Sequence, residues 1–216
     1  MIDWNQIDSV FLDMDGTLLD LHFDNHFWLS HVPMRYAEKH GLSHAASQDA
    51  LNPRYQNVVG TMNWYCVDYW SRELQLDIAR LKEEVAHLIA VHPHVENFLQ
   101  ALRRANKRVV LVTNAHHKSL ALKMQRTRLA SYFDAVICAH DLGIPKEHAD
   151  FWEKLQAVER FHPAATLLVD DSLPVLRSAQ AYGIDHLLAV YRPDTRLPDK
   201  EVGEFAAIRD FRDILL

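Results

Sequence analysis

The feature that most constrains the fold of this chain is a short apolar run, Ser9–Leu12, that leads directly into the sequence DMDGT at residues 13–17. An apolar run of this length, stopped by a glycine, is typical of a buried strand in a parallel sheet. Because side chains alternate along a strand, Asp13 and Asp15 leave its carboxyl end on the same side. Two adjacent carboxylates repel each other unless a cation or a shared proton compensates, so the motif predicts a site for a hard divalent ion such as Mg²⁺.

Other apolar runs end in polar residues that suit the same site. These residues are Thr113 and Asn114 after residues 108–112, Asp170 and Asp171 after residues 166–169, and Lys146 in a loop ahead of an amphipathic segment. Parallel strands bring their carboxyl ends to one edge of a sheet, which is where open α/β sheets bind ligands. The sequence therefore predicts one polar site built from three strand ends and a loop.

The order of apolar runs predicts the fold class. Strand-like runs near residues 9–13, 108–113, 135–139, 166–170 and 186–190 alternate with helical patterns at residues 94–105, 118–129, 147–160 and 173–182. This alternation is typical of α/β proteins with a doubly wound parallel sheet, a Rossmann-like core.

The long gap between the first two predicted strands indicates an inserted domain. A crossover between parallel strands needs a dozen or more residues, yet about 95 residues separate Asp15 from Val109. The inserted sequence is helical by pattern, with Asp77 as an N-cap and Gly41 and Ser43 between two helices. We predict a core domain of residues 1–20 and 91–216 and a helical cap of residues 21–90 above the strand ends.

The order of the motifs, DMDGT, then Thr-Asn, then Lys, then DDS, resembles that of the haloacid dehalogenase superfamily of aspartate-nucleophile phosphohydrolases. The resemblance covers almost the whole chain. The stretches LDMDGTLLDLHFDNHFW, NWYCVDYW, LVTNAH and LLVDDS are similar to the bacterial purine 5′-nucleotidases that hydrolyse GMP and IMP. This resemblance implies a Mg²⁺-dependent phosphomonoester hydrolase that works through an aspartyl-phosphate. It also implies a purine nucleoside monophosphate as the small-molecule substrate.

The resemblance also implies a role for each core residue. Asp13 would be the nucleophile, and Asp15 would protonate the leaving alcohol and later deprotonate the attacking water. Mg²⁺ would be bound by the Asp13 carboxylate, the Asp15 main-chain carbonyl and Asp171, with Asp170 either a further ligand or purely structural. The residues that would hold the phosphate and balance its charge are Thr113, the Asn114 backbone and Lys146.

The predicted cap is rich in aromatic residues, and most of these are expected to form the core of a small helical bundle. Four residues of the cap are candidates for contact with the substrate: Phe23, Asp24, Asn63 and Tyr65. Aromatic side chains suit the stacking of a purine base. An amide such as Asn63 can donate to the O6 or N7 acceptors that guanine and hypoxanthine share.

Two other functions remain open at the level of sequence. The same catalytic groups could serve a phosphatase of a sugar phosphate or phosphoglycolate. A phospho-receiver signalling domain also uses an acidic pair, a phosphorylated aspartate, a threonine and a lysine, although its acidic pair precedes the phosphorylated aspartate. A dehalogenase is disfavoured, because that branch of the superfamily works without metal and lacks a second acid at the position of Asp15.

Composition limits the partners and the compartment. The net charge of −6 and the absence of a long basic stretch argue against nucleic acid or an anionic membrane as a partner. The sequence has no long apolar span and no signal-peptide pattern at its start, which predicts a cytoplasmic enzyme. Cys66 and Cys138 are predicted to be buried free thiols, and His116 and His117 to be surface or capping residues. The sequence leaves the oligomeric state undetermined.

Overall fold

A parallel sheet of six strands, in the order β3-β2-β1-β4-β5-β6, lies at the centre of the computed structural model, which describes residues 2–216. The strands are β1 (Ser9–Leu12), β2 (Arg108–Thr113), β3 (Ala135–Cys138), β4 (Thr166–Val169), β5 (His186–Val190) and β6 (Ala207–Ile208). The chain runs outward from β1 through β2 and β3, and returns to β4 on the other side of β1. The predicted fold class is therefore confirmed. β6 was not predicted, because two residues are too few to show a strand pattern.

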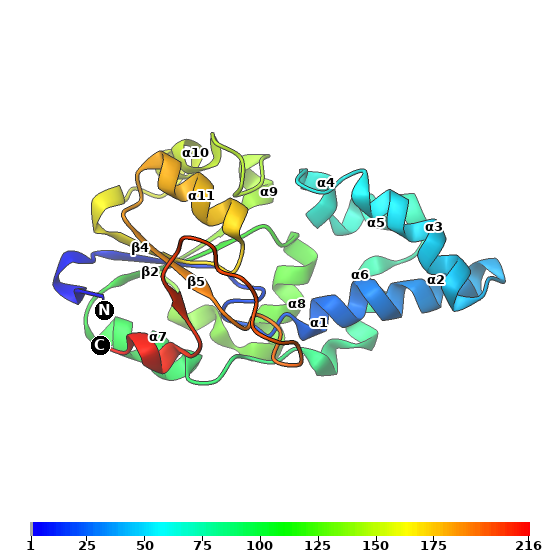
Figure 1. Cartoon of the computed structure of the whole chain (residues 1–216), viewed down its shortest axis with the longest axis horizontal. Coiled ribbons are helices and arrows are strands. Elements are labelled where there is room, and N and C mark those ends of the chain that lie inside the picture. Colours follow the sequence, from blue (N-terminus) through cyan, green and yellow to red (C-terminus); the bar gives the residue numbers. More distant parts are fainter. Residues whose placement is uncertain (1) are drawn as a thin grey trace.

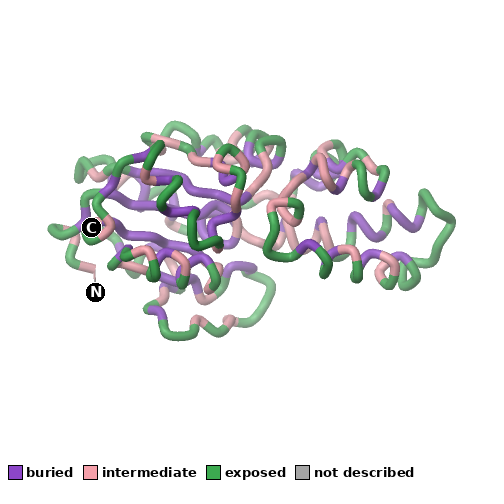
Figure 2. The backbone as a smooth tube through the Cα atoms, turned by 90° about the horizontal axis from the view of Figure 1, so that it is seen from above, coloured by how far each residue is buried: buried purple, intermediate pink, exposed green. Residues whose placement is uncertain are grey.

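Helices cover both faces of this sheet. They are α7 (Val95–Arg104), α8 (His117–Thr127), α9 (Ala139–Leu142), α10 (Phe151–Val158) and α11 (Leu173–Tyr182), with short 3-10 turns at Trp4–Gln6, Leu129–Tyr132, Pro163–Ala165 and Phe211–Ile214. Alternate residues of β1 point to opposite faces: Leu12 packs in the cluster of α7 and Phe11 in that of α10 and α11. Figure 2 shows the strands as the buried centre of this part of the molecule. Among residues 2–216, none of the helices has the length and apolar character needed to cross a membrane.

Most helix ends follow the local signals in the sequence. Helix α11 ends at Gly183, whose φ of 104° is in the left-handed region that glycine adopts readily. One predicted helix is shorter than expected, since α10 begins at Phe151 and not at residue 147. The reason is a turn, in which the amide of His148 donates to the carbonyl of Pro145 before the helix begins.

The segment between β1 and β2 forms a second helical layer, which we call the insert (residues 21–90). It contains α1 (His22–His26), a π-helical turn (Phe27–His31), α2 (Val32–His40), α3 (His44–Gln56), α4 (Met62–Tyr65), α5 (Val67–Leu74), α6 (Ile78–Glu84) and a 3-10 turn (Ala86–Leu88). Asp77 and Ser43 cap α6 and α3 as predicted. The insert has its own hydrophobic cluster, in which Leu51 and Trp70 are fully buried. In Figure 1 its outer helices, in blue and cyan, extend away from the sheet.

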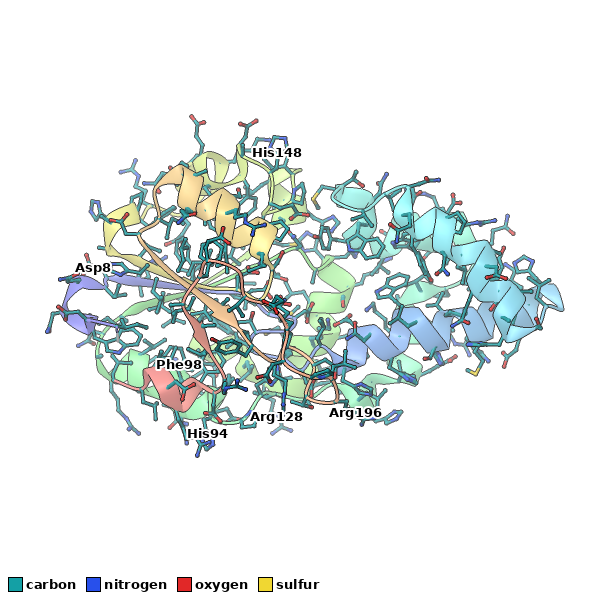
Figure 3. The ribbon with its side chains drawn as sticks, in the orientation of Figure 1. Asp8, His94, Phe98, Arg128, His148 and Arg196 are labelled. Atoms are coloured by element: carbon teal, nitrogen blue, oxygen red, sulfur yellow. The ribbon has the colours of Figure 1, made fainter. Side chains whose placement is uncertain are left out.

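The insert leaves and rejoins the rest of the chain at a single place. The amide of Asp20 donates to the carbonyl of Ala90 at 2.9 Å, and the amide of His92 donates to the carbonyl of Leu18 at 2.9 Å. Figure 3 shows Asp8, just before β1, at the end of the core away from the insert, and Arg196, in the loop after β5, on the side of the insert. The carboxyl ends of the strands therefore face the insert.

Candidate active site

The core residues predicted from the sequence gather around one cavity of about 370 Å³. Those that line it are Asp13, Asp15, Thr113, Asn114, Lys146, Asp170 and Asp171, and the insert supplies the opposite wall. The volume lies within the range of small-molecule sites. The carboxyl ends of β1, β2 and β4, together with the loop after α9, thus form one polar floor.

Lys146 is the centre of this floor. Its Nζ lies 2.5 Å from Oδ1 of Asp13 and 2.7 Å from Oδ2 of Asp170, and it donates to the Val112 carbonyl at 3.0 Å. Burial alone would lower the pKa of Lys146, but the charges of Asp13 and Asp170 outweigh burial and raise it. The ammonium group therefore stays charged although it is almost completely buried.

Three carboxylates share the space beside Lys146. Single oxygens of Asp13, Asp170 and Asp171 lie within 4.8 Å of one another. Burial raises the pKa of Asp13 to about 6 although Lys146 opposes the shift. Burial likewise raises the pKa of Asp171 to about 6 against the charge of Lys200. This concentration of buried negative charge fits the binding of a hard divalent cation.

Asp170 differs from its two neighbours because both of its oxygens already have partners. Oδ2 accepts from Lys146, and Oδ1 accepts from the backbone amide of Ser172 at 2.9 Å. Asp171 instead contacts Lys200, a residue of the loop after β5, at 3.1 Å. These contacts favour a structural role for Asp170 and leave Asp13 and Asp171 better placed to bind a cation.

Gly16 allows the close approach of two strand ends. Its φ of +86° is in the region that favours glycine. A Cβ at this position would lie only 2.8 Å from Cγ of Asp171 and 3.0 Å from Cβ of Pro193. The glycine therefore lets the loop after β1 lie directly against the acid that follows β4.

A chain of buried charges links Asp15 to the insert. Nζ of Lys123, on α8, lies 2.6 Å from Oδ1 of Asp15 and 2.6 Å from Oδ2 of Asp24, on α1. Nζ of Lys82, on α6, lies 3.0 Å from the other oxygen of Asp24. The two lysines were not predicted as site residues. The signal that could have identified Lys123 is its spacing. It lies three residues after Leu120 and therefore on the same buried face of α8.

The two acids in this chain of charges have very different acidities. Burial raises the pKa of Asp15 to about 6, although Lys123 opposes the shift. For Asp24 burial would also raise the pKa, but Lys123 and Lys82 outweigh it and hold the pKa at about 2. Asp24 lines the cavity, but as the ionised partner of two lysines.

A second link joins the insert to the phosphate-binding residues expected on β2. The hydroxyl of Tyr65 donates to Oε1 of Glu147 at 2.8 Å, and Nδ2 of Asn114 donates to Oε2 at 2.9 Å. Oδ1 of Asn114 in turn accepts from the amide of Lys146 at 2.9 Å. Oγ1 of Thr113 accepts from the amide of Ala115 at 3.0 Å, which leaves its hydroxyl proton free to donate. Glu147 was not predicted as a site residue.

The structure places the four predicted insert residues very differently. Tyr65 and Asp24 line the cavity, whereas Phe23 is buried inside the insert and Asn63 is exposed outside the cavity. The structure thus does not bring Phe23 or Asn63 to the site. The aromatic lining comes instead from other residues, chiefly Trp28, Tyr55, Trp64 and Trp70.

The cysteine prediction is correct in part. Cys66 and Cys138 are both free, but Cys66 is only half-buried and not buried as expected. His116 acts as predicted as a helix cap, since its Nδ1 accepts from the amide of Lys118 at the start of α8. Its ring also lines the cavity.

Comparison with known proteins identifies the family. The model of the haloacid dehalogenase-like hydrolase family matches residues 7–183. The GMP/IMP nucleotidase YrfG of Escherichia coli (strain K12) is 36% identical over 214 residues, which cover 99% of this chain and 96% of that protein. A phosphoglycolate phosphatase of Nitrosospira multiformis is 36% identical over 101 residues, 46% of this chain and 43% of that protein.

A solved structure shows the same fold over nearly the whole length. The HAD phosphatase from Thermococcus onnurineus has a TM-score of 0.79 at 22% identity, with 96% of each chain covered. The resemblance predicted from the motifs is confirmed, and the match to a hydrolase family favours an enzyme over a phospho-receiver. The chain belongs to the haloacid dehalogenase-like hydrolases and is a phosphomonoester hydrolase.

Proposed function

We propose that this enzyme is a Mg²⁺-dependent purine 5′-nucleotidase that converts GMP or IMP to the nucleoside and phosphate through an aspartyl-phosphate. The observation that carries the proposal is the position of Asp13. Its carboxylate is held by Lys146 on the floor of a cavity whose opposite wall is aromatic. The proposal is also supported by the 36% identity to a GMP/IMP nucleotidase over nearly the full length of both chains.

The residues around Asp13 suit a two-step phosphoryl transfer. An oxygen of the Asp13 carboxylate attacks phosphorus, and the bond from phosphorus to the nucleoside oxygen breaks as that oxygen takes a proton from Asp15. Water then attacks the aspartyl-phosphate, gives its proton to Asp15 and releases phosphate with regeneration of the Asp13 carboxylate. A pKa of about 6 lets Asp15 act both as acid and as base near neutral pH.

The remaining core residues hold the phosphate and balance its charge. Lys146 neutralises part of the negative charge that the nucleophile and the phosphate bring together. The hydroxyl of Thr113 and the backbone of Asn114 donate to phosphate oxygens. Asp13, the carbonyl of Asp15 and Asp171 would hold Mg²⁺, which when bound neutralises the charge that develops on the phosphoryl oxygens.

We further propose that residues 21–90 act as a cap on a core of residues 1–20 and 91–216. The links from Lys123 to Asp24 and from Glu147 to Tyr65 hold the insert over the strand ends. A closed cap excludes water from the aspartyl-phosphate until the leaving group has departed. Substrate entry requires these links to open.

The aromatic wall supports a nucleobase as the part of the substrate that the insert recognises. Trp28 and Trp64 line the cavity and are only half-buried, so their rings are accessible from it. Stacking of a base on an aromatic ring contributes about 1–3 kcal/mol. A hydrogen-bond donor on the cavity wall would then select a 6-oxopurine. At position 6 of the purine, GMP and IMP present an acceptor oxygen, whereas AMP presents an amino group that donates.

A substrate panel with two neighbouring variants tests the proposal. We expect kcat/KM for GMP and IMP to exceed that for AMP, ribose 5-phosphate and phosphoglycolate. Trp64→Leu should lower kcat/KM for GMP by about tenfold, which corresponds to ~1.4 kcal/mol of lost stacking, and should leave ribose 5-phosphate hydrolysis nearly unchanged. Asn63→Ala is the matched control, since Asn63 is adjacent in sequence but exposed outside the cavity.

The panel can also contradict the proposal. If ribose 5-phosphate or phosphoglycolate is hydrolysed as efficiently as GMP, the aromatic wall is only a packed lid and the enzyme is a phosphatase of small phosphate esters. An equal loss of GMP activity in Asn63→Ala and Trp64→Leu would likewise argue against base recognition at the cavity wall.

The proposed Mg²⁺ site makes a prediction about pH. In the metal-free protein the pKa values of Asp13, Asp15 and Asp171 lie at about 6, above the range of an unfolded chain. These groups favour the folded state at low pH, and that stability is lost as the pH rises through the folded pKa values. Mg²⁺ replaces the lost protons, so it should raise the Tm more at about pH 8 than at about pH 5.

Thermal unfolding with Mg²⁺ and with excess chelator checks this expectation. A shift of about two pH units in the pKa of one carboxyl group corresponds to about 3 kcal/mol in the free energy of unfolding. The effect of Mg²⁺ on the Tm at high pH should therefore be readily measurable. Chelator should also abolish phosphate release, and Ca²⁺ should restore it poorly because it takes more ligands at longer distances. A Tm gain that is equal at both pH values, or full activity in chelator, would rule out this metal site.

A further inference from the structure

A second group of potential metal ligands lies at the boundary between the insert and the core. Cys66, between α4 and α5 of the insert, meets His116, at the start of α8, and His140, on α9. One ligand atom of each residue lies within 4.8 Å of the others. The rings of His116 and His140 have their centroids 4.9 Å apart at 84°. The three residues therefore converge on one point from two sides of the boundary.

The ring of His140 is oriented as a ligand would be. Its Nε2 is buried and has no hydrogen-bond partner among residues 2–216. In the tautomer with the proton on Nδ1, the lone pair of this Nε2 is free to bind a metal. An unpartnered buried nitrogen is costly unless it binds something.

The other two residues also suit a metal. The sulfur of Cys66 is the N-cap of α5 and accepts from the amide of Tyr69 at 3.3 Å, and the amino end of a helix stabilises negative charge. His116 would exchange a single long hydrogen bond, 3.3 Å from the amide of Lys118, for the metal. The other ring nitrogen of His116, Nε2, lies 3.7 Å from Oδ2 of Asp68, a carboxylate that can orient the ring.

A neighbouring group of similar composition is less suitable. His117, Cys138 and Asp141 also lie within 4.8 Å of one another. However, His117 is already paired with Asp141 at 3.0 Å, and the thiol of Cys138 donates to the carbonyl of Ala115 at 3.1 Å. The first group is therefore the one with an unused ligand atom.

We propose that Cys66, His116 and His140 bind a transition-metal ion, Zn²⁺ foremost, and that this ion fastens the insert to the core. A thiolate with two imidazoles is a donor set that Zn²⁺ binds well and Mg²⁺ avoids. The ion differs from the Mg²⁺ of the carboxylate floor in both chemistry and position. Because His116 lines the cavity, an ion that holds the insert against the core here restricts the passage of substrate and product. Zn²⁺ therefore acts as an inhibitor.

Cobalt binding tests the site without relying on activity. The full chain is dialysed against Co²⁺ in saturating Mg²⁺, which occupies the carboxylate floor. We expect Co²⁺ to bind with a near-ultraviolet charge-transfer band, which only a thiolate ligand produces. Cys66→Ser should abolish the band, and His140→Gln should weaken Co²⁺ binding at least about tenfold. The matched controls Cys138→Ser and His148→Gln should keep both the band and the affinity.

The effect on activity provides a second, independent readout. Zn²⁺ should inhibit hydrolysis of p-nitrophenyl phosphate by the parent enzyme, and Cys66→Ser should resist that inhibition while its activity without Zn²⁺ is unchanged. Zn²⁺ that merely displaces Mg²⁺ from the carboxylates would inhibit both proteins equally. The proposal is overturned by such equal inhibition, by the absence of a thiolate band, or by a band that survives Cys66→Ser and is lost in Cys138→Ser.

Discussion

Replacement of Asp13 by asparagine is expected to abolish multiple-turnover hydrolysis and to leave the fold intact. The amide fills the same space but cannot attack phosphorus, so we expect phosphate release in saturating Mg²⁺ to fall by at least about 10³-fold, or ~4 kcal/mol. The thermal stability of the metal-free variant should not decrease. Burial raises the pKa of Asp13 to about 6, which means that the ionised side chain is unfavourable in the folded metal-free protein at neutral pH.

The natural control for this variant is Asp8→Asn. Asp8 precedes β1 by one residue and is exposed at the amino end of the strand, whereas Asp13 follows its carboxyl end (Figure 3). The control should keep full activity. Activity of Asp13→Asn within about tenfold of the parent, a change of only ~1.4 kcal/mol, would remove Asp13 from the nucleophile role.

The second large effect is expected from Lys123→Met, on both stability and catalysis. The substitution leaves Asp15 without its cation and Asp24 with only Lys82 in a buried setting. Loss of one partner from a buried ion pair costs about 3–5 kcal/mol, which for a chain of this size lowers the Tm by roughly 10 °C. Asp15 should also become a weaker acid, so the limb of the pH–rate profile that it controls should move to higher pH.

Two further variants separate charge from packing at Lys123. Lys118→Met, on the same helix, removes an exposed lysine paired with Asp68 and should leave the Tm nearly unchanged. Asp15→Asn in the Lys123→Met background should recover a large part of the lost stability, because it removes the charge that Lys123 no longer neutralises, while Asp24 keeps its partner Lys82. No recovery in the double variant would show that the methylene chain of Lys123, and not its charge, stabilises the protein.

The residues of the polar floor were predictable because their signal is local. A buried parallel strand appears as an apolar run, and the first polar residues after it lie at the edge where ligands bind. Asp13, Thr113 and Asp170 each follow such a run directly. Their convergence on one cavity needed no knowledge of how the insert packs. Their catalytic roles stay predictions until the variants are measured.

The contacts between the insert and the core were not predictable in the same way. Lys123 and Glu147 meet their partners in the insert, Asp24 and Tyr65, only when α1 and α4 pack over the strand ends, and no local pattern encodes that packing. The positions of Phe23 and Asn63 away from the cavity are a matter of helical phase. The π-helical turn Phe27–His31 interrupts the regular spacing after α1, and α4 is a single turn, so periodicity could not show which aromatic residues face the cavity.

The hydrogen bond between Asp20 and Ala90 has a consequence for how this chain can change over evolution. The two ends of a 70-residue segment lie side by side. The insert is therefore joined to the core at two adjacent points, as a closed surface loop would be. The entropic penalty of closing such a loop grows by only about 0.6 kcal/mol for each doubling of its length. Helices can therefore be added, lost or exchanged between these two points at little expense to the sheet. Under the proposed roles of insert and core, substrate preference can therefore change in evolution while the phosphoryl chemistry stays the same.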